Sequence, residues 1–590
     1  MNAAHPTALA WRERSVVRDG VRLAVFDIGD PTATTVVLVH GWPDTHHLWT
    51  QVAPILAESF HVVAYDTRGY GSSDAPDGDA AYTLPELALD LFAVARAVSE
   101  RPVHVVAHDW GSVQTWEAVC TAGADDHIAS FTSVSGPSLD QLGRWSRDRL
   151  THPTPGSLRN ALSQMASSAY TVLFQLPVVP KVFFAAVGHP AVWRRFLQAV
   201  EGTDPADIVV GPTLRRDFVS GLRYYRANIR PRLFHPNPRP TDIPVFEIVN
   251  HRDIALRAAI FDDTGRYAAR LWRRDLPTGH WLPYARPQLL AQLARDFIES
   301  RVAEHDSPTI ARARVTGRRG ALVRTLTVIT GGGSGIGRET ALLFADQGSE
   351  VVVADIDLAA AEKTAAEVAR RRGRAHAYAL DVADTEALTA FAETVAARHG
   401  IADIVVNNAG IGLAGALLDA TDTQLRRLVD INLMGVATGS RVFGRQMVAR
   451  GAGGHIVNLA SQAAYMPQRG LGAYAATKAA VLMLSESLGA ELAEHRIGVS
   501  AICPGVVHTN ITRTTEFAGR SAEEQERQRD RMDGLYRRRG FTPDRVATQI
   551  LAAVTENRAV VPVTVESAVS YRLYRFFPGL TRRMARMKIL

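Results

Sequence analysis

The chain has 590 residues, of which 46% are hydrophobic and 21% are charged, and its formal net charge is +6 at pH 7. It is too long for one hydrophobic core, so we expect at least two domains of ordinary globular composition. Its two cysteines, Cys120 and Cys503, lie far apart, which excludes a disulfide framework and a cysteine metal site and favours a reducing interior.

The excess positive charge lies largely in short arginine clusters and in the C-terminal tail. No zinc-finger spacing or RNA-binding aromatic motif accompanies these clusters, so we expect no nucleic-acid partner. The N-terminal residues lack the basic and then apolar layout of a signal peptide, which favours a cytoplasmic protein. The most apolar stretch, Ala161–Gly188, is interrupted by Gln164, Pro177 and Lys181, so we do not expect it to span a membrane.

Strand-like apolar runs alternate with helical periods along residues 1–302, which predicts an α/β domain with a parallel sheet. An insert at about residues 138–240 is helical and rich in aromatic residues and prolines, and we expect it to form a cap over the sheet. The segment Arg286–Glu299 has apolar residues at helical spacing and is expected to close the domain. The predicted strands are Thr35–Val39, His61–Tyr65, Val103–Ala107, Ala129–Val134 and Pro244–Val249.

The motif Ala107-His108-Asp109-Trp110-Gly111 follows the third of these strands and precedes a helical pattern. A nucleophile elbow needs such a strand, a sharp turn between small residues, and a helix. With Asp109 at the turn, the nucleophile is a carboxylate, which attacks carbon and forms an alkyl ester. This chemistry suits the opening of an epoxide or the displacement of a halide.

An earlier strand ends at His40-Gly41-Trp42-Pro43. We expect the backbone N–H groups of Trp42 and Trp110 to form an oxyanion hole for the hydrolysis of the ester. His40 and His108 are expected to line the pocket or to brace its backbone.

The remaining catalytic groups should follow in the order nucleophile, acid, histidine. Asp253 comes shortly after the strand that ends at Val249, and His280 lies just before the closing helix. This order predicts that Asp253 orients His280. Asp66 and Arg68 lie outside this order, and we interpret them as an Asp–Arg pair that organises a turn.

These motifs resemble those of the α/β-hydrolase superfamily, and within it the epoxide hydrolases, over about Val16–Ser300. The motifs around the nucleophile also suit haloalkane dehalogenases, which stay an alternative. Epoxide hydrolases carry two cap tyrosines, and the settings Tyr170-Thr-Val-Leu-Phe-Gln and Tyr-Tyr225-Arg-Ala-Asn match theirs. The resemblance implies that Asp109 attacks an epoxide carbon while both tyrosines hold the oxygen, and that His280 then activates water to release a diol.

Residues 303–324 are basic and without pattern, and we expect them to form a linker. A second α/β domain is expected over residues 325–570, because strand-like runs again alternate with helical periods. The predicted strands are Leu326–Thr330, Glu350–Ala354, Ile404–Val406, His455–Leu459 and Gly498–Cys503.

A glycine-rich turn follows the first of these strands and precedes the apolar helix Glu339–Ala345. Its glycines would let the backbone approach a pyrophosphate at the N-terminus of that helix. Asp355 ends the next strand, where a carboxylate accepts from the ribose hydroxyls and repels a 2′-phosphate, so NAD is expected in preference to NADP. The turn residues expected to contact the cofactor are Gly331, Ser334, Gly335, Ile336 and Gly337.

Tyr474 and Lys478 lie four residues apart on one predicted helical face. The ammonium is expected to lower the pKa of the tyrosine, which would allow proton exchange near neutral pH. With Asn407-Asn408-Ala409-Gly410, these residues resemble the short-chain dehydrogenase/reductase family over roughly Leu326–Pro562. The resemblance implies that Ser461 holds the substrate oxygen and that Asn432 supports a proton-relay water. It also implies cofactor contacts from Tyr474, Lys478, Asn408, Ala409, Gly410, Asp381, Val382, Pro504, Gly505 and Thr509.

As a whole, the chain resembles actinobacterial proteins that fuse an epoxide hydrolase to a short-chain dehydrogenase. The resemblance implies an α/β-hydrolase domain with a helical cap, followed by a Rossmann-type doubly wound parallel sheet. It implies a bifunctional enzyme for an epoxide and for an alcohol or ketone, with homo-oligomerisation through the second domain. The apolar cap segment Met165–Val187 and the C-terminal tail favour apolar, lipid-like substrates. The alternative is that one half is an inert scaffold for the other.

Two segments near the C-terminus have no assigned chemistry. Thr512–Arg539 is charged and irregular, and by resemblance we expect it to form the substrate loop. The tail, residues 571–590, mixes aromatic residues with arginines, and a basic segment with an apolar face can lie on an anionic membrane. Surface decoration and a dimer contact are the alternatives for this tail.

Overall fold

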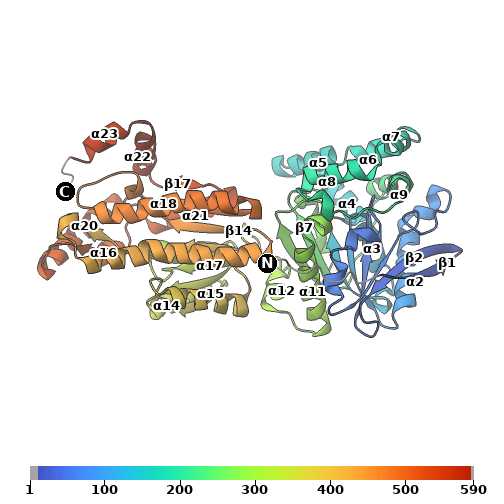
Figure 1. The fold of residues 1–590 in the computed structure, drawn as a ribbon, viewed down its shortest axis with the longest axis horizontal. Helices are drawn as coiled ribbons and strands as arrows, with labels where there is room; N and C mark the ends of the chain where they lie inside the picture. The colour runs from blue at the N-terminus through green and yellow to red at the C-terminus, as the bar shows by residue number, and fades with distance from the viewer. Residues whose placement is uncertain (1–10, 587–590) are drawn as a thin grey trace. The chain divides into compact units, whose positions relative to one another are not determined.

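The computed structural model describes residues 11–586 and divides into two compact units, Met1–Val315 and Thr316–Leu590 (Figure 1). The division falls inside the segment for which the sequence predicts a linker. Each unit is built on its own sheet, with helices on both faces.

Part of the predicted linker is structured. Helix α12 (Pro308–Ala313) begins after Ser307, whose hydroxyl accepts from the N–H of Ile310. Ile310 is buried, and the N–H of Val315 donates to the carbonyl of Leu271 at 2.8 Å. This segment is therefore part of the first unit, because it has its own cap and a buried apolar anchor.

The first sheet has eight strands in the order β1-β2-β4-β3-β5-β6-β7-β8. The pairs from β4 to β8 are parallel, and β1 and β2 pair antiparallel. The five predicted strands correspond to β3–β7, whereas β1, β2 and the charged edge strand β8 have no counterpart in the prediction. The bounds are β1 (Arg12–Arg18), β2 (Val21–Ile28), β3 (Thr35–Val39), β4 (His61–Tyr65), β5 (Val103–His108), β6 (Ile128–Val134), β7 (Val245–Asn250) and β8 (Leu271–Leu276).

The insert between β6 and β7 is helical, as the sequence predicts for the cap, and its helices α5–α8 gather at one end of the unit (Figure 1). The apolar stretch Ala161–Gly188 is divided among three short helices. In the part of the chain that the structure describes, no helix is long and apolar enough to cross a membrane. The helices are α1 (Ala53–Leu56), α2 (Leu84–Val98), α3 (Trp110–Val119), α4 (Leu139–Thr151), α5 (Pro155–Ser167), α6 (Tyr170–Phe174), α7 (Val179–Val187), α8 (Pro190–Glu201), α9 (Leu214–Phe234), α10 (Leu282–Ala285) and α11 (Pro287–Val302).

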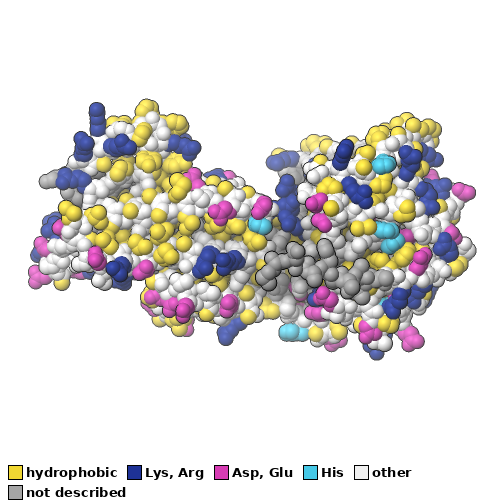
Figure 2. Space-filling view, in the orientation of Figure 1, with side chains coloured by type: hydrophobic (Ala, Val, Ile, Leu, Met, Phe, Trp, Pro, Cys, Tyr) yellow, Lys and Arg dark blue, Asp and Glu magenta, His cyan; other side chains and the backbone are white. Residues whose placement is uncertain are grey.

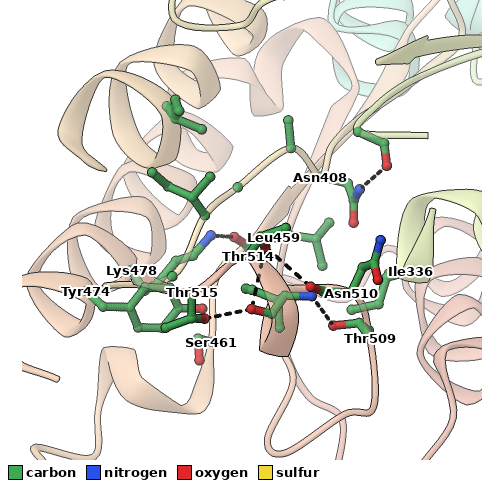
Figure 3. A pocket seen from close by; sticks show the side chains of 18 of the residues that line it. Ile336, Asn408, Leu459, Ser461, Tyr474, Lys478, Thr509, Asn510, Thr514 and Thr515 are labelled. Atoms are coloured by element: carbon green, nitrogen blue, oxygen red, sulfur yellow. Dashed lines mark hydrogen bonds between the residues drawn. The ribbon is translucent and has the colours of Figure 1, made fainter. Parts of the chain in front are cut away.

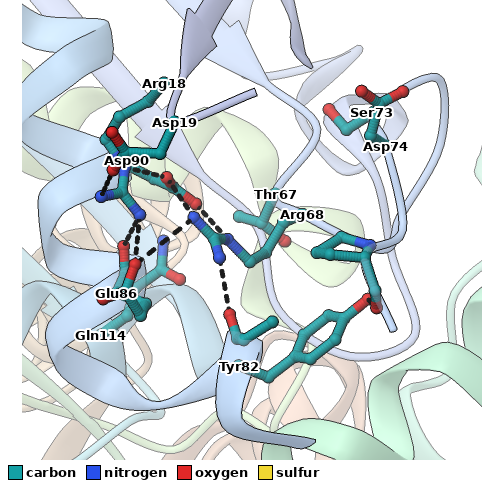
Figure 4. Close-up of polar contacts among 12 residues, drawn as sticks. Arg18, Asp19, Thr67, Arg68, Ser73, Asp74, Tyr82, Glu86, Asp90 and Gln114 are labelled. Carbon is teal, nitrogen blue, oxygen red and sulfur yellow. Dashed lines mark hydrogen bonds and ion pairs between the residues drawn. The ribbon is translucent and has the colours of Figure 1, made fainter. Parts of the chain in front are cut away.

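A buried ion-pair network fixes the loop after β4 (Figure 4). Arg68 donates to both carboxylate oxygens of Asp90, at 2.5 and 2.6 Å, and Arg18 donates to the same carboxylate at 2.7 Å. Asp66 instead accepts from the backbone N–H and the ring of His46, at 2.9 and 2.8 Å. The predicted Asp66–Arg68 pair is therefore wrong, because the two side chains face different elements.

Replacement of Asp90 with alanine is expected to destabilise the first unit by about 3–5 kcal/mol, because it leaves a buried guanidinium without its carboxylate. Calorimetric melting of the full chain measures this effect as a lower transition temperature for that unit. Asp74→Ala is the matched control, since Asp74 is half-exposed and its pair with Arg22 spans 3.7 Å. Equal melting temperatures for the two variants would contradict the assignment.

The second sheet has seven strands in the order β11-β10-β9-β12-β14-β15-β17, and all neighbours are parallel. The chain order reverses between β9 and β12, which places a ligand crevice at the carboxyl ends of these strands. A short pair, β13 (Leu413–Ala414) and β16 (Glu516–Phe517), lies outside this sheet. The bounds are β9 (Leu326–Thr330), β10 (Glu350–Asp355), β11 (Arg374–Ala379), β12 (Ile404–Asn407), β14 (Gly454–Leu459), β15 (Ile497–Cys503) and β17 (Val560–Pro562).

Two expectations about the C-terminal part differ from the structure. The segment predicted as irregular contains helix α20, which begins with a reciprocal cap between Ser521 and Glu524. The predicted tail boundary at residue 571 cuts through helix α22, and residues 587–590 lie outside the described part. The helices are α13 (Gly335–Asp346), α14 (Leu358–Arg370), α15 (Thr385–His399), α16 (Asp422–Val429), α17 (Gly435–Arg450), α18 (Gly472–Leu492), α19 (Ile511–Thr514), α20 (Ala522–Arg539), α21 (Pro543–Glu556), α22 (Val565–Phe576) and α23 (Pro578–Met584).

Candidate active sites

Asp109 stands at the tight turn between β5 and α3. Its backbone has φ 50° and ψ −122°, a strained conformation that persists only where the surrounding structure enforces it. Two glycines make room for the turn: a Cβ on Gly111 would lie 2.3 Å from the carbonyl oxygen of Val39, and one on Gly41 would lie 2.5 Å from the Asp109 carboxylate. This is the geometry of the predicted nucleophile elbow.

The two predicted oxyanion donors meet at this carboxylate. The N–H of Trp42 donates to Oδ2 of Asp109 at 2.8 Å, and the N–H of Trp110 helps to lower the pKa of the same carboxyl. Fixed backbone donors of this kind stabilise negative charge on oxygen without reorganisation during the reaction.

His280 joins Asp109 to the predicted acid. Its Nδ1 lies 2.8 Å from Oδ2 of Asp253, and its Nε2 lies 3.6 Å from Oδ1 of Asp109. The other oxygen of Asp253 accepts from the N–H groups of Ala255 and Leu256, at 2.8 and 2.9 Å. The structure thus brings the three predicted residues together in one chain of contacts.

Charge pairing governs the protonation of this trio. Burial opposes ionisation of Asp109, but the hydrogen bond and charge of His280 outweigh it, so the pKa of Asp109 lies below its usual value. Burial lowers the pKa of His280, but Asp253 and Asp109 outweigh it and hold that pKa well above its usual value. Loss of the Asp109 charge in an ester would therefore lower the pKa of His280 again.

His40 and His108 brace the backbone and do not contribute to the cavity wall. The Nε2 of His40 accepts from the N–H of Thr67 at 3.0 Å, and its Nδ1 lies 2.9 Å from the carbonyl of Gly41. The Nε2 of His108 lies 2.8 Å from the carbonyl oxygen of His280. Of the two roles that the sequence left open for these residues, the structure supports the second.

Tyr170 and Tyr225 share one cavity with Asp109. The cavity measures about 450 Å³, and His280 also lines it. The two rings are neighbours, with centroids 6.2 Å apart and planes inclined by 72°. Tyr225 is 3% exposed and Tyr170 is 37% exposed at the cavity mouth. Burial raises the pKa of both tyrosines, so at neutral pH both hydroxyls keep the proton that they need to act as donors.

The neighbours of Tyr225 explain its setting in the sequence. The hydroxyl of Tyr224 donates to the carbonyl of Arg68 at 2.8 Å, which anchors α9 to the loop described above. Asn228 accepts from the N–H of Leu84 at 2.8 Å, and Gln175 donates to the carbonyl of Tyr225 at 3.2 Å. These contacts hold the helix that carries Tyr225 between the body of the unit and α6.

Two buried acids near this cavity, Glu201 and Asp44, were not predicted from the sequence. The N–H of Trp281 donates to Glu201 at 3.1 Å, which fixes the loop that carries the catalytic histidine. Asp44 accepts from the ring N–H of Trp281 at 3.2 Å and from the hydroxyl of Tyr284 at 2.9 Å. Burial raises the pKa of Asp44 to about 7. No motif marks these acids, because their partners lie far away in the sequence.

The second unit has a cleft of about 540 Å³ at the carboxyl ends of its strands. Of the predicted residues, Gly337 and Asn432 lie outside its lining. Gly337 packs within the turn, where a Cβ would lie 2.2 Å from the carbonyl oxygen of Gly331. The predicted residues that line the cleft are Gly331, Ser334, Gly335, Ile336, Asp355, Asp381, Val382, Asn408, Ala409, Gly410, Ser461, Tyr474, Lys478, Pro504, Gly505 and Thr509.

The cleft fits a nicotinamide dinucleotide. Gly331 and Gly335 have φ angles of 63° and 53°, and a Cβ on Gly331 would lie 2.8 Å from the Cα of Ala409. Only glycine can bring the backbone so close, which leaves the N-terminus of α13 open to a pyrophosphate. Asp355 accepts from the N–H of Gly333 at 2.8 Å, so its carboxylate is fixed beside this turn.

Ser461, Tyr474 and Lys478 meet at the other end of the cleft (Figure 3). Ser461 and Tyr474 both line this end of the cleft, and Ser461 favours the ionised form of the phenol by lowering its pKa. Lys478 donates to the carbonyl of Leu459 at 2.7 Å, and its Nζ lies 5.9 Å from the centre of the Tyr474 ring.

The expected lowering of the Tyr474 pKa is wrong. Burial raises the pKa of Tyr474 to about 12, although Ser461 opposes this change. Burial also lowers the pKa of Lys478 to about 8. The reason is that desolvation outweighs an ammonium that is directed at a carbonyl instead of the phenol.

Asn432 is fully buried in a wide helical turn, Asp430–Met434, which precedes α17. Its side chain accepts from the N–H of Ile411 and donates to the carbonyl of Ile411, both at 2.9 Å. These bonds fix the strand-to-loop segment along the cleft. The predicted water relay stays a prediction.

Substrate-side residues of this cleft were missed by the sequence reasoning. They come from segments far apart in the chain and include Arg427, Gln462, Glu516, Met532 and Tyr536. The capping pattern Ser521-x-x-Glu524 is the one local signal that could have shown that the last two lie on a helix.

The comparisons with known proteins cover both units. The family model for the alpha/beta hydrolase fold matches residues 34–168, and the model for the short chain dehydrogenases matches residues 325–518. The chain is similar to the sorbitol dehydrogenase of Cereibacter sphaeroides, with 41% identity over 180 residues, which cover 30% of this chain and 69% of that protein.

One relative spans both units. The protein named "Probable oxidoreductase EphD" of Mycobacterium tuberculosis (strain ATCC 25618 / H37Rv) is 45% identical over 583 residues, which cover 97% of this chain and 98% of that protein. The protein of the same name from Mycobacterium bovis matches equally well. The chain therefore belongs to the family of enzymes that fuse an α/β-hydrolase domain to a short-chain dehydrogenase/reductase domain, together with the mycobacterial EphD proteins.

Proposed function

We propose that the first unit is an epoxide hydrolase and that the second unit is an NAD-dependent oxidoreductase for an alcohol or a ketone. The observation that carries the first assignment is the meeting of Tyr170, Tyr225 and Asp109 at one cavity. A carboxylate nucleophile opposite two protonated phenols suits a substrate whose leaving oxygen stays attached to the molecule.

In the first step, a carboxylate oxygen of Asp109 forms a bond to one ring carbon of the epoxide. The carbon–oxygen bond of the ring breaks, and its electron pair goes to the oxygen, which takes a proton from Tyr170 or Tyr225. A positioned general acid is needed here because an alkoxide is a poor leaving group. The phenolate is then neutralised by the proton of His280, whose pKa falls when Asp109 loses its charge.

In the second step, neutral His280 removes a proton from water, and the water oxygen attacks the ester carbonyl of Asp109. The N–H groups of Trp42 and Trp110 hold the resulting oxyanion. Collapse of this intermediate breaks the acyl–oxygen bond and returns the proton from His280 to the departing alkoxide. The product is a vicinal diol. Asp253 stabilises the imidazolium form of His280 whenever that ring is protonated.

Replacement of Tyr170 and Tyr225 with phenylalanine tests the assignment against the dehalogenase alternative. The double variant should hydrolyse epoxides about 10²–10⁴-fold more slowly, because it loses general acid assistance. Diol formation from a panel of apolar epoxides measures this loss. Undiminished halide release from haloalkanes by the same variant would favour a dehalogenase. The ring N–H of Trp42, a donor that could otherwise hold a halide, donates to the carbonyl of Phe218 at 3.1 Å.

The walls of the first cavity support an apolar, lipid-like epoxide. They are formed largely by aromatic and aliphatic side chains, and the polar groups among them are mainly those of the catalytic residues. Such a lining binds hydrocarbon and leaves orientation to the few polar groups. The lining residues outside the catalytic set are Ser167, Phe174, Phe183, Phe184, Val187, Val192, Trp193, Phe196, Phe218, Ile254, Ala255 and Trp281.

In the second unit, the bound nicotinamide cofactor would accept or supply the hydride. The turn at Gly331 would hold its pyrophosphate, and Asp355 would bind its ribose hydroxyls. Tyr474 exchanges a proton with the substrate oxygen, Ser461 hydrogen-bonds the same oxygen, and Lys478 places positive charge beside them. The preference for NAD rests on the carboxylate of Asp355, which would repel a 2′-phosphate.

Replacement of Asp355 with serine should lower the ratio of NAD to NADP activity by about 10- to 100-fold, since a hydrogen bond to a charged group is worth about 1.5–3 kcal/mol. The ratio of kcat/KM for the two cofactors is the measurement, because it cancels any general loss of activity. Asp357→Ser is the matched control, because Asp357 caps α14 and does not line the cleft. An unchanged ratio in the Asp355 variant would contradict the assignment.

A further inference from the structure

The outer face of the cap exposes many apolar side chains. Helix α7 is buried on one side through Phe184, whose ring packs against Trp42, and its other side faces solvent. Figure 2 shows apolar side chains gathered over this helix at the upper right of the view. Monomeric soluble proteins rarely expose such a surface without a function. The most exposed members are Leu162 (53%), Met165 (55%), Val172 (72%), Val178 (61%), Val179 (55%), Val182 (62%) and Phe183 (55%).

The charged side chains within the cap segment itself have one sign. Residues 149–200 contain no aspartate and no glutamate, although most protein surfaces mix both signs. Their cations are Arg149, Arg159, Lys181, Arg194 and Arg195. Arg149 pairs with Asp263 of the body, whereas Arg159, Lys181 and Arg195 are exposed on the cap helices.

The mouth of the hydrolase cavity opens within this apolar face. Tyr170, Phe183, Val192 and Phe196 line the cavity, and each is also 37–55% exposed on the outside of the cap. The cavity wall and the outer face therefore form one continuous apolar surface. An apolar molecule on this face would therefore lie beside the mouth of the cavity that holds Asp109.

We propose that this face, formed by α5–α8, is a docking surface for an anionic phospholipid bilayer. The apolar side chains of α6 and α7 enter the interfacial region, and Arg159, Lys181 and Arg195 contact anionic headgroups. The cavity mouth then faces the lipid. A cationic rim favours this occupant over a second copy of the chain, because two copies of the same rim would repel each other.

Flotation of the full chain with phospholipid vesicles tests the proposal. We expect binding to vesicles that contain phosphatidylglycerol, weaker binding to phosphatidylcholine alone, and a decrease with added salt. Val172→Asp, Val178→Asp and Val182→Asp should each lower the partition coefficient at least about tenfold, because each exchanges an inserted apolar group for a charge. None of these residues lines the cavity, so the melting temperature and the dehydrogenase activity should not change.

Two controls separate this face from other surfaces. Val17→Asp changes an equally exposed valine, 65% exposed on β1 of the same unit, and should leave binding intact. Phe576→Ser with Phe577→Ser changes the most exposed aromatic residues of the C-terminal helices and tests the tail as the contact. Loss of binding in the tail variant alone would overturn the proposal.

Three further results would also overturn the proposal. The first is wild-type protein that does not float with anionic vesicles, and the second is cap variants that float as well as the wild type. The third is a wild-type dimer that the cap variants convert to a monomer, with no vesicle binding by either protein. The last result would identify a second copy of the chain as the occupant, and light scattering measures it. Failure of epoxide turnover would not affect this test, because flotation needs no substrate.

Discussion

Replacement of Asp109 with alanine is expected to abolish epoxide hydrolysis, with a loss of at least about 10³-fold, because no ester can form. The strained backbone at Asp109 and the contacts with His280 and with the N–H of Trp42 all position the carboxylate of Asp109. A structural aspartate would need none of this arrangement. Diol formation from a small epoxide under saturating conditions is the measurement.

The dehydrogenase activity of the same variant is its internal control, because Asp109 belongs to the other compact unit. We expect this activity to be unchanged. Asp77→Ala is a matched second control, since Asp77 is fully exposed and does not line the cavity. Its carboxylate pairs with Arg223 at 3.4 Å. Residual hydrolysis near the wild-type rate in Asp109→Ala would remove the basis of the proposed covalent mechanism.

Replacement of Tyr474 with phenylalanine should lower the oxidoreductase activity about 10²–10⁴-fold, because it removes the group that exchanges a proton with the substrate oxygen. Burial raises the pKa of Tyr474 to about 12, and Ser461 opposes this rise. The cofactor-dependent absorbance change with a panel of secondary alcohols and ketones is the measurement. Cofactor binding itself should persist, because the glycine turn and Asp355, which would hold the pyrophosphate and the ribose, are unchanged in this variant.

Epoxide hydrolysis by the Tyr474 variant should equal that of the wild type, which also tests the idea that one unit is an inert scaffold. Tyr378→Phe is a matched control, because that hydroxyl bonds His399 at 2.7 Å and does not line the cleft. If Tyr378→Phe lost as much oxidoreductase activity as Tyr474→Phe, the loss would reflect folding and not chemistry.

Much of the fold could be predicted from the sequence, because buried parallel strands appear as short apolar runs. The strands β3 and β9 were predicted with their observed bounds. Among the strands that were missed, β1 and β8 are edge strands of the first sheet, and their charged residues hide the apolar pattern. Helix α12 was missed because a helix of six residues is too short to show a repeating hydrophobic pattern. Ser307 and Pro308 mark its start.

The candidate sites were predicted to the extent that each residue belongs to a local motif. Asp109 lies in a strand–turn–helix pattern, and Tyr474 and Lys478 lie one helical turn apart. Groups that act through tertiary contacts left no local signal: Glu201 reaches the loop of His280 only in the folded chain. The pKa of Tyr474 was predicted in the wrong direction because sequence spacing shows the ammonium but not the burial.

The most direct test of the central claim is a single turnover of an epoxide by excess enzyme in water labelled with oxygen-18. Water attacks the ester carbonyl of Asp109 in the proposed mechanism, so the label should enter the carboxylate of Asp109 and the first diol should carry none. Mass spectrometry of the diol and of the peptide around Asp109 measures both. Label in the first diol and none in Asp109 would show that water attacks the epoxide directly, and it would contradict the account.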